Sequence, residues 1–290
     1  MKSALVLGGT RFVGKRLVEL LRNQGVAVTI GSRGRQPIPP GVKHVKVDRF
    51  DLQSMQSALA QGEWDIVYDQ VCYTPEDAIL AMDLFKGRVG RYVLCSSGAV
   101  YKKAVDAGEE QFDPFHLPIQ LEGRTVEYGE GKRQSEAVLF QRGSFSSVAV
   151  RFPIILGPDD YSERLRVQVR RVAAGETVRL VNADSQISLV ASSDAAAFLL
   201  WLSTIDRTGP FNACSIPCIA LKDIVAMIER ATGKTATVAR EPDENRFSLF
   251  WAASSFYMNP TRARQCGFQF LSNREWLESL VREEAALAQS

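Results

Sequence analysis

The chain lacks any run of apolar residues long enough to cross a bilayer, which takes about 20 residues. Its longest candidate, Ala195 to Leu202, has only the length of a buried helix segment. The apolar residues of the N-terminal MKSALVLGG are too few for the core of a secretion signal. We therefore expect no membrane partner and a cytoplasmic location.

Histidine is scarce, and the cysteines form no pattern. The 290 residues include two histidines, His44 and His116, and five cysteines, at positions 72, 95, 214, 218 and 266. Cys214 and Cys218 have neither the spacing nor the companion pair of a zinc knuckle. An odd number of scattered thiols does not suggest a disulfide framework. The sequence predicts buried, inert thiols and no metal site.

An excess of charge of either sign is also missing. There are 35 Lys and Arg residues against 33 Asp and Glu residues, for a formal net charge of +2. With 46% hydrophobic and 23% charged residues, the composition is that of a folded globular protein and excludes a disordered or collagen-like chain. The charge balance gives no strong attraction to nucleic acid or to an anionic membrane, although it permits a local basic patch.

The first half of the chain alternates short β-type runs with helical patterns, which is typical of a parallel sheet with crossover helices. A helix is expected to begin at Thr74, where Thr-Pro-Glu-Asp supplies an N-cap, a proline and an acidic third position. We predict an α/β fold with a Rossmann-type doubly wound parallel sheet. The predicted strands cover residues 3–7, 26–30, 44–47, 65–68, 92–95 and 148–152.

The alternation of β-type runs and helical patterns stops after residue 152. Helical patterns dominate from there on, and no long linker or internal repeat occurs. We predict a cofactor-binding domain over residues 1–152 and a smaller C-terminal substrate region over residues 153–290 that packs on it. The aromatic residues of segment 247–257 suit either a substrate-pocket wall, ordinary core or a subunit contact. The helices expected in this region cover residues 162–174, 194–203, 221–232 and 273–288.

A glycine-rich turn follows the first predicted strand and opens directly into a helix. It reads Gly8-Gly9-Thr10-Arg11-Phe12-Val13-Gly14. Glycines at such a turn let the backbone approach a pyrophosphate, whose charge the N–H groups of the helix N-terminus hold. A tight turn without a ligand is the alternative, but the placement between strand and helix favours dinucleotide binding.

The end of the second predicted strand carries no acid for the ribose hydroxyls. It reads Gly31-Ser32-Arg33-Gly34-Arg35. Arg33, with Arg11 in the first turn, is suited to pair with a 2′-phosphate, so NADP is favoured over NAD as the cofactor. The alternative is that these arginines are solvated loop residues.

A serine, a tyrosine and a lysine form the third pattern. Ser97 lies in Ser96-Ser97-Gly98-Ala99-Val100-Tyr101 at a strand end, and Tyr128 and Lys132 lie four residues apart at the start of a helical pattern. That spacing places both on one helix face, near enough for the ammonium to stabilise the phenolate. Such a tyrosine exchanges a proton with a substrate hydroxyl or carbonyl, which the serine positions.

Together these motifs resemble the extended and atypical short-chain dehydrogenase/reductase superfamily, the NAD(P)-dependent epimerase/dehydratase group. The resemblance implies that Ser97 orients the substrate, that Tyr128 is the acid/base and that Lys132 assists Tyr128 and binds the nicotinamide ribose. It also implies that Asp48 and Arg49 lie beside the adenine. The full cofactor-binding set expected is Gly8, Thr10, Arg11, Phe12, Val13, Gly14, Ser32, Arg33, Asp48, Arg49, Asp69, Gln70, Lys132, Pro153 and Ile154.

The sequence departs from that family at four places. Arg11 replaces the middle glycine of the turn, as in an atypical subgroup of the family, so its guanidinium is an alternative ligand for the pyrophosphate. Asp69-Gln70-Val71 replaces small residues after the fourth strand. Pro153-Ile154 replaces an asparagine common in sugar-nucleotide epimerases, and the substrate-clamping arginine before Asp194 is missing. The last two weaken the case for a nucleotide-sugar substrate. A different clamp is available from Arg164, Arg166, Arg170, Arg171 and Arg179.

The expected reaction is hydride transfer at a secondary alcohol or carbonyl of a sugar or nucleotide sugar, in a reduction, an epimerisation or a dehydration. A homodimer is left open. GGTRF, SSGAVY and GPDDY also resemble the chloroplast stem-loop-binding proteins, which implies an alternative role as a cofactor-bound RNA-binding or regulatory protein. Because an RNA-binding role does not require the Tyr128 and Lys132 pair, we favour an enzyme and do not expect nucleic acid as its partner.

Overall fold

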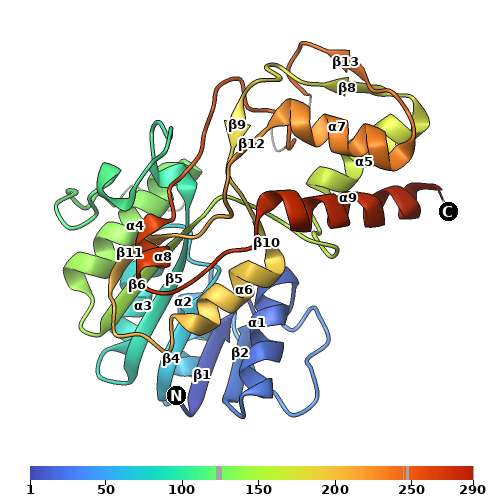
Figure 1. The fold of residues 1–290 in the computed structure, drawn as a ribbon. Helices are drawn as coiled ribbons and strands as arrows, with labels where there is room; N and C mark the ends of the chain where they lie inside the picture. Colours follow the sequence, from blue (N-terminus) through green and yellow to red (C-terminus); the bar gives the residue numbers. More distant parts are fainter. Residues whose placement is uncertain (122–125, 244, 246–247, 290) are drawn as a thin grey trace.

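A seven-stranded parallel sheet forms the centre of the protein, whose structure is a computed structural model describing residues 1–121, 126–243, 245 and 248–289. Every neighbouring pair in the sheet is parallel. This is the predicted Rossmann-type doubly wound α/β fold (Figure 1). Across the sheet the order is β11 (Gly209–Asn212), β6 (Ser146–Phe152), β5 (Val89–Ser97), β4 (Trp64–Asp69), β1 (Ser3–Leu7), β2 (Ala27–Ser32) and β3 (Lys43–Lys46).

Helices cover both faces of this sheet, and successive residues of β1 show how the strands serve both layers. Ala4 and Val6 pack in the core beneath α1 (Phe12–Asn23) and α6 (Ser192–Trp201), because alternate side chains of a strand point to opposite faces. Leu5 and Leu7 pack in the opposite core. That second core receives α2 (Leu52–Leu59), α3 (Pro75–Phe85) and α4 (Tyr128–Arg142).

The predicted start of α3 is confirmed. Thr74 is the N-cap, Pro75 is the first helical residue, and the Thr74 side chain accepts a hydrogen bond from the Asp77 backbone N–H. The Asp77 carboxylate in turn accepts one from the Thr74 N–H, which completes a capping box.

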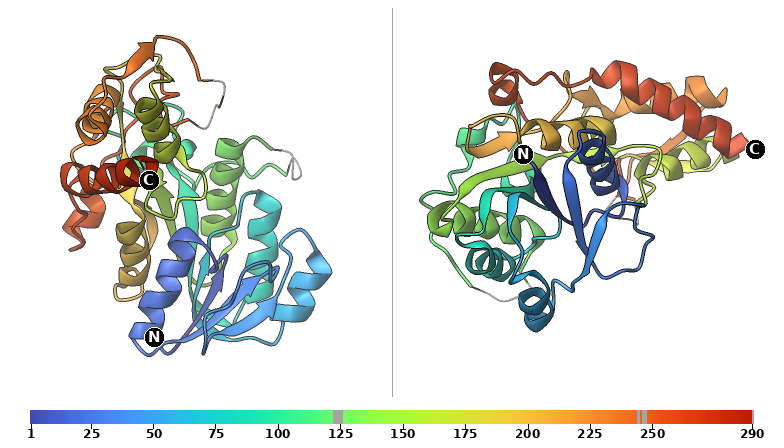
Figure 2. Two further views of the ribbon diagram at one scale, coloured as in Figure 1. Left: turned by 90° about the vertical axis from the view of Figure 1, so that its right-hand side faces the viewer. Right: turned by 90° about the horizontal axis from the view of Figure 1, so that it is seen from below.

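Much of the C-terminal region gathers beyond the carboxyl ends of the central strands (Figures 1 and 2). Its core packs α5 (Arg164–Ala174), α7 (Leu221–Thr232) and α9 (Asn273–Gln289) together. Three short strand pairs accompany these helices: β7 (Ile154–Leu156) with β10 (Leu189–Ala191), β9 (Gln186–Ile187) with β12 (Ile219–Ala220), and β8 (Thr177–Arg179) with β13 (Thr237–Ala239).

The chain returns to the central sheet after residue 152. The helix α6 packs on α1, and β11 adds the last strand beside β6, with α8 (Thr261–Gln265) against it. Residues beyond 152 therefore help to build the layers of the first half. Within the described residues, no helix combines the length and apolarity that a bilayer crossing requires.

Candidate active site

The glycine-rich turn joins β1 to α1 at the carboxyl edge of the sheet. Gly8 has a φ of +90°, a conformation that favours glycine. A Cβ on Gly14 would lie 2.3 Å from the Gly8 carbonyl oxygen, so this position has no room for a side chain. The N-cap residue of α1, Arg11, makes no side-chain cap hydrogen bond. The geometry therefore suits the approach of an anionic group to the helix N-terminus.

The other predicted residues of this turn differ in exposure. Arg11 is exposed, whereas Thr10 and Phe12 are half-buried. Val13 belongs to the hydrophobic core under α1. A contact between Val13 and a cofactor would accordingly use its backbone.

The end of β2 presents a hydroxyl and an exposed guanidinium, and no acid. The Ser32 Oγ lies 3.0 Å from the His44 Nε2 and accepts a hydrogen bond from the Gly34 N–H at 3.3 Å. Arg33, between these residues, is exposed. The arrangement leaves Arg33 accessible to a phosphate at this edge.

Two predicted cofactor residues, Arg49 after β3 and Asp69 at the end of β4, pair with each other. Arg49 is buried and forms an ion pair with Asp69, which is fully buried. Asp69 also accepts a hydrogen bond from the Tyr92 hydroxyl, and the Arg49 Nε lies 4.0 Å from the Asp77 Oδ1. These polar contacts thus connect β4, β5 and the start of α3. Any contact of Asp69 with a cofactor would have to come through its backbone.

Asp48, Gln70, Pro153 and Ile154 all follow carboxyl ends of central strands. The Asp48 carboxylate accepts a hydrogen bond from the Phe50 N–H at 3.0 Å, which shapes the loop after β3. The Gln70 Nε2 lies 2.8 Å from where a Cβ of Gly14 would stand, so this amide packs under the glycine-rich turn. Pro153 and Ile154 are half-buried beyond β6.

Tyr128 and Lys132 come together at the start of α4. Lys132 is only 2% exposed, and its Nζ donates to the carbonyl oxygens of Cys72, at 2.6 Å, and Cys95, at 2.8 Å. The Nζ also lies 5.9 Å from the centre of the Tyr128 ring. Tyr128 itself is 49% exposed. A buried ammonium thus lies behind an accessible phenol.

Ser97 ends β5, and its Oγ accepts a hydrogen bond from the Ala99 N–H at 3.2 Å. Within the described part of the chain, no direct hydrogen bond joins Ser97 to Tyr128 or Tyr128 to Lys132. The three residues therefore share one edge of the sheet without forming a closed hydrogen-bonded set.

Tyr73, which sequence reasoning missed, belongs to the same cluster. The centre of its ring lies 4.6 Å from the Lys132 Nζ and 6.4 Å from the centre of the Tyr128 ring. The ammonium therefore has an aromatic face beside it, in cation–π range. A signal was available, since Tyr73 lies in the same loop after the fourth strand as Gln70.

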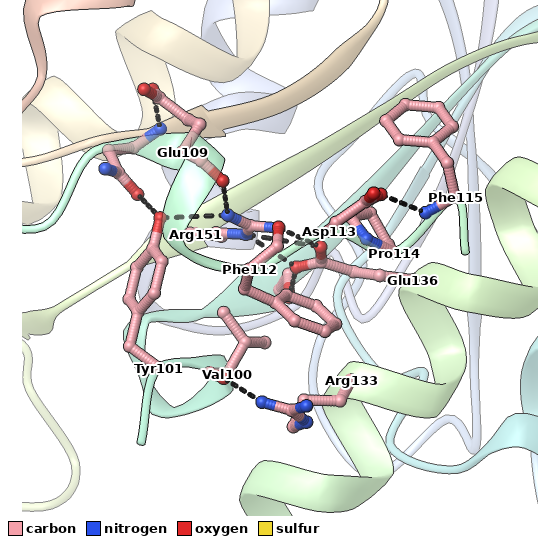
Figure 3. Close-up of polar contacts among 12 residues, drawn as sticks. Val100, Tyr101, Glu109, Phe112, Asp113, Pro114, Phe115, Arg133, Glu136 and Arg151 are labelled. Carbon is pink, nitrogen blue, oxygen red and sulfur yellow. Dashed lines mark hydrogen bonds and ion pairs between the residues drawn. The ribbon is translucent and has the colours of Figure 1, made fainter. Parts of the chain in front are cut away.

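A buried network around Arg151 was also missed (Figure 3). Arg151 lies in β6 and is fully buried, and its Nη2 donates to the Glu136 Oε2 at 2.7 Å. Its Nη1 donates to the Tyr101 hydroxyl at 2.9 Å, and Ser96 donates to Glu136. Burial acts to lower the pKa of Arg151, but the Glu136 carboxylate raises it above its ordinary value.

This network supports the candidate site from below. Glu136 follows Lys132 by one turn of α4, and Ser96 precedes Ser97 in β5. The Arg151 and Glu136 pair therefore holds α4 against β5 and β6, next to the parts of α4 and β5 that carry Lys132 and Ser97.

The arginines proposed as a substrate clamp are mostly engaged with acids. Arg166 pairs with Glu284 at 2.6 Å, Arg171 with Asp243 at 2.6 Å and Arg179 with Glu241 at 2.9 Å. These pairs tie parts of the C-terminal region together.

The aromatic segment divides between core and surface. Phe250 is fully buried in the C-terminal core, whereas Trp251 is exposed. Phe247 lies outside the described residues. Phe256 and Tyr257 are half-buried. Among its described aromatic residues, the segment therefore contributes Phe250 to the core, whereas Trp251 and in part Phe256 and Tyr257 stay accessible to a ligand or partner.

The parallel sheet with its glycine-rich turn between β1 and α1 is a Rossmann-type fold, and Tyr128 and Lys132 lie together at the start of α4. Residues 4–79 match the sequence model of the NAD dependent epimerase/dehydratase family, which confirms the resemblance inferred from the motifs. The chain is also 28% identical over 205 residues to the chloroplast stem-loop binding protein of 41 kDa b of Arabidopsis thaliana. That match covers 64% of this chain and about half, 51%, of the plant protein.

Solved structures show the same fold. The UDP-glucose 4-epimerase of Thermus thermophilus in complex with NAD superposes with a TM-score of 0.76 at 18% identity, over 99% of both chains. The UDP-N-acetylglucosamine 4-epimerase of Bacillus cereus gives a TM-score of 0.69 at 18% identity, over 100% of this chain and 97% of that one. The fold therefore extends through the C-terminal region.

Proposed function

We propose that the protein is an NAD(P)-dependent enzyme that transfers hydride at a secondary alcohol or carbonyl of a sugar or nucleotide sugar. The net reaction is a reduction, an epimerisation or a dehydration. The match to the epimerase/dehydratase family model and the nucleotide-sugar epimerases among the structural neighbours support this class of substrate.

The observation that carries the proposal is the buried Lys132 ammonium behind the accessible Tyr128 phenol. Burying an ammonium is costly, and Lys132 makes its hydrogen bonds to two carbonyl oxygens. Among the described residues, Lys132 forms no ion pair with a carboxylate. Its positive charge thus remains available to stabilise the negative charge that develops on Tyr128 when the phenol gives up its proton.

Each residue then has a defined part in the reaction. Tyr128 passes its phenolic proton to the substrate oxygen, or takes one from it, and the Ser97 hydroxyl holds that oxygen in place. When bound, the nicotinamide cofactor supplies or accepts the hydride. The residues suited to hold it are the glycine-rich turn from Gly8 to Gly14, whose uncapped helix N-terminus fits a diphosphate, together with Ser32 and Arg33 at the end of β2.

NADP is the proposed cofactor because an exposed arginine, Arg33, stands where an NAD site has an acid. Replacing Arg33 with Ala removes a charge-assisted hydrogen bond, so we expect about a 10- to 100-fold loss of NADP affinity. NAD affinity should change little. Fluorescence titration of both cofactors measures the two ratios, and an Arg33→Ala protein that binds NADP as well as the wild type would overturn the preference.

A second candidate is a cofactor-bound protein that associates with RNA. The similarity to the plant stem-loop binding protein favours it. Against it, the arginines at positions 166, 170 and 171 are within ion-pair distance of acids, which reduces the positive charge that α5 offers to phosphates.

One pair of assays separates the two candidates. Purified protein is incubated with NADP or NAD and a panel of sugars and UDP-sugars. The absorbance of the reduced nicotinamide reports net oxidation or reduction, and analysis of the sugar products reports isomerisation. In parallel, retention of a stem-loop RNA is measured against salt concentration. Turnover with a sugar supports the enzyme, whereas steeply salt-dependent RNA retention without turnover supports the second candidate.

A further inference from the structure

The segment of residues 157–163, here called the strap, crosses the N-terminal turn of α1. It leaves β7 at Gly157 and ends at Glu163, the N-cap of α5. The Asp159 carboxylate forms an ion pair with Arg16 of α1 at 2.7 Å. Although the strap and α1 are about half the chain apart in sequence, the strap is therefore attached beside the glycine-rich turn.

Tyr161 of the strap contacts two consecutive residues of that turn. Its ring meets the Phe12 ring edge-on, with centroids 6.2 Å apart, and the Arg11 guanidinium carbon lies 6.0 Å from the Tyr161 ring centroid. Tyr161 is 70% exposed, so hydrophobic burial explains little of its position. Arg11 is exposed as well, and its donors stay accessible to a ligand at the turn.

The backbone of the turn is strained at the point that Tyr161 contacts. Phe12 has a φ of +46°, in the left-handed region that residues with a side chain seldom adopt. Such conformations persist where surrounding contacts hold them, and they concentrate at ligand sites. The Tyr161 ring supplies one of those contacts from outside the turn.

The other side of the strap is anchored to the C-terminal region. The Arg166 Nη2 donates to the Pro158 carbonyl oxygen at 2.9 Å, and the same guanidinium pairs with Glu284 of α9. The strap thus connects the C-terminal region to the glycine-rich turn through Pro158, Asp159 and Tyr161.

We propose that Tyr161 is a positioning residue that holds the Arg11 guanidinium as a ligand for the diphosphate of the dinucleotide. The inference rests on the proposed function, and it assigns to the strap a part in cofactor binding. Arg11 supplies the charge where the usual turn has a glycine, and the Tyr161 ring face fixes its direction.

The test compares three side chains at position 161. Tyr161→Phe keeps the ring face, whereas Tyr161→Leu keeps an apolar contact with Phe12 and loses the ring face. Because a cation–π contact at an exposed site contributes modestly, we expect Tyr161→Leu to weaken NADP binding about two- to fivefold and Tyr161→Phe to stay within about 1.5-fold of wild type. Dissociation constants are measured by titration with NADP, ADP-ribose and 2′-AMP.

The control ligand and a double variant separate positioning from general damage to the fold. 2′-AMP carries no diphosphate, and the proposal assigns its 2′-phosphate to Arg33 and the diphosphate to Arg11, so its affinity should be the same in all three proteins. In an Arg11→Ala background, Tyr161→Leu should have no further effect on NADP, since Tyr161 acts through Arg11. Equal NADP affinity of the wild type and Tyr161→Leu, an equal loss for 2′-AMP, or additive losses in the double variant would each overturn the inference. Failure of the wild type to bind any dinucleotide would instead remove the proposed function itself.

Discussion

Lys132 and Arg151 are both buried cations in the same part of the molecule, but their surroundings give them different roles. The Glu136 carboxylate neutralises Arg151, whose other N–H groups donate hydrogen bonds to the Tyr101 hydroxyl and to backbone carbonyls. Lys132 is held by carbonyl oxygens beside the Tyr73 and Tyr128 rings. The first arrangement stabilises structure, whereas the second leaves a positive charge to act on a neighbour.

Removing the charge of Glu136 tests the structural role of the Arg151 pair. Glu136→Gln leaves a buried guanidinium without its counter-charge, and breaking a buried pair in this way costs about 3–5 kcal/mol. Urea unfolding should show this loss in the free energy of unfolding. The matched control is Glu130→Gln in the same helix, where the partly exposed pair with Arg133 contributes less than about 1 kcal/mol. Equal small losses in both variants would contradict the account.

At the scale of elements, local signals suffice for some helix boundaries. The capping box of α3 depends on residues 74–77 alone, so it can be predicted from the sequence. Thr74→Ala removes one acceptor from the N-terminus of α3, and we expect a loss of about 1 kcal/mol in the free energy of unfolding. Thr74→Ser keeps the hydroxyl and should recover most of it. Thermal or urea denaturation of the three proteins gives the comparison, and an Ala variant as stable as the Ser variant would refute the contribution of the cap.

Other elements have no local signal. The six strands predicted from β-type runs all belong to the central sheet, but the seventh, β11, was missed because it has four residues and begins with Gly and Pro. Such a strand is tolerated at the sheet edge, where it pairs with β6 alone. The two- and three-residue strands of the C-terminal region likewise form only because distant segments meet there.

The site shows the same division. Its glycine turn and the Tyr128 and Lys132 spacing can be found in the sequence because each depends on neighbouring residues. The Arg49 and Asp69 pair, the Arg151 network and the contact of Tyr161 with Arg11 join residues 15 to 150 positions apart. Their chemistry was visible in the sequence, but their partners depend on the packing of whole layers.

For the molecule as a whole, the C-terminal region should lose stability in acid. Asp243 pairs with Arg171 of α5. Burial would raise the pKa of Asp243, but hydrogen bonds from Arg171, the Asn245 backbone and Ser248 hold it at about 2. Because this pKa is lower than the usual value of about 4, the charged form stabilises the fold above about pH 4. That contribution, about 2 kcal/mol, is lost as the pH falls toward 2.

Urea unfolding measured between pH 7 and pH 2 checks this prediction. Asp243→Asn should lower stability at pH 7 and flatten the decline between about pH 4 and pH 2. The control is Asp184→Asn, which removes an exposed pair with Lys222 that water screens. If the free energy of unfolding of Asp243→Asn fell with pH in parallel with that of the wild type between about pH 4 and pH 2, the Asp243 and Arg171 pair would not be the cause of the acid instability.

The central claim is that Tyr128, assisted by Lys132, performs proton transfer in an NAD(P)-dependent reaction. The most direct measurement compares turnover and cofactor affinity of the wild type and Tyr128→Phe, with the sugar substrate that gives turnover. Phenylalanine keeps the ring beside Tyr73 and removes only the hydroxyl. We predict a loss of turnover of about 10²- to 10⁴-fold with a cofactor dissociation constant that stays nearly unchanged. Full activity in Tyr128→Phe would contradict the account.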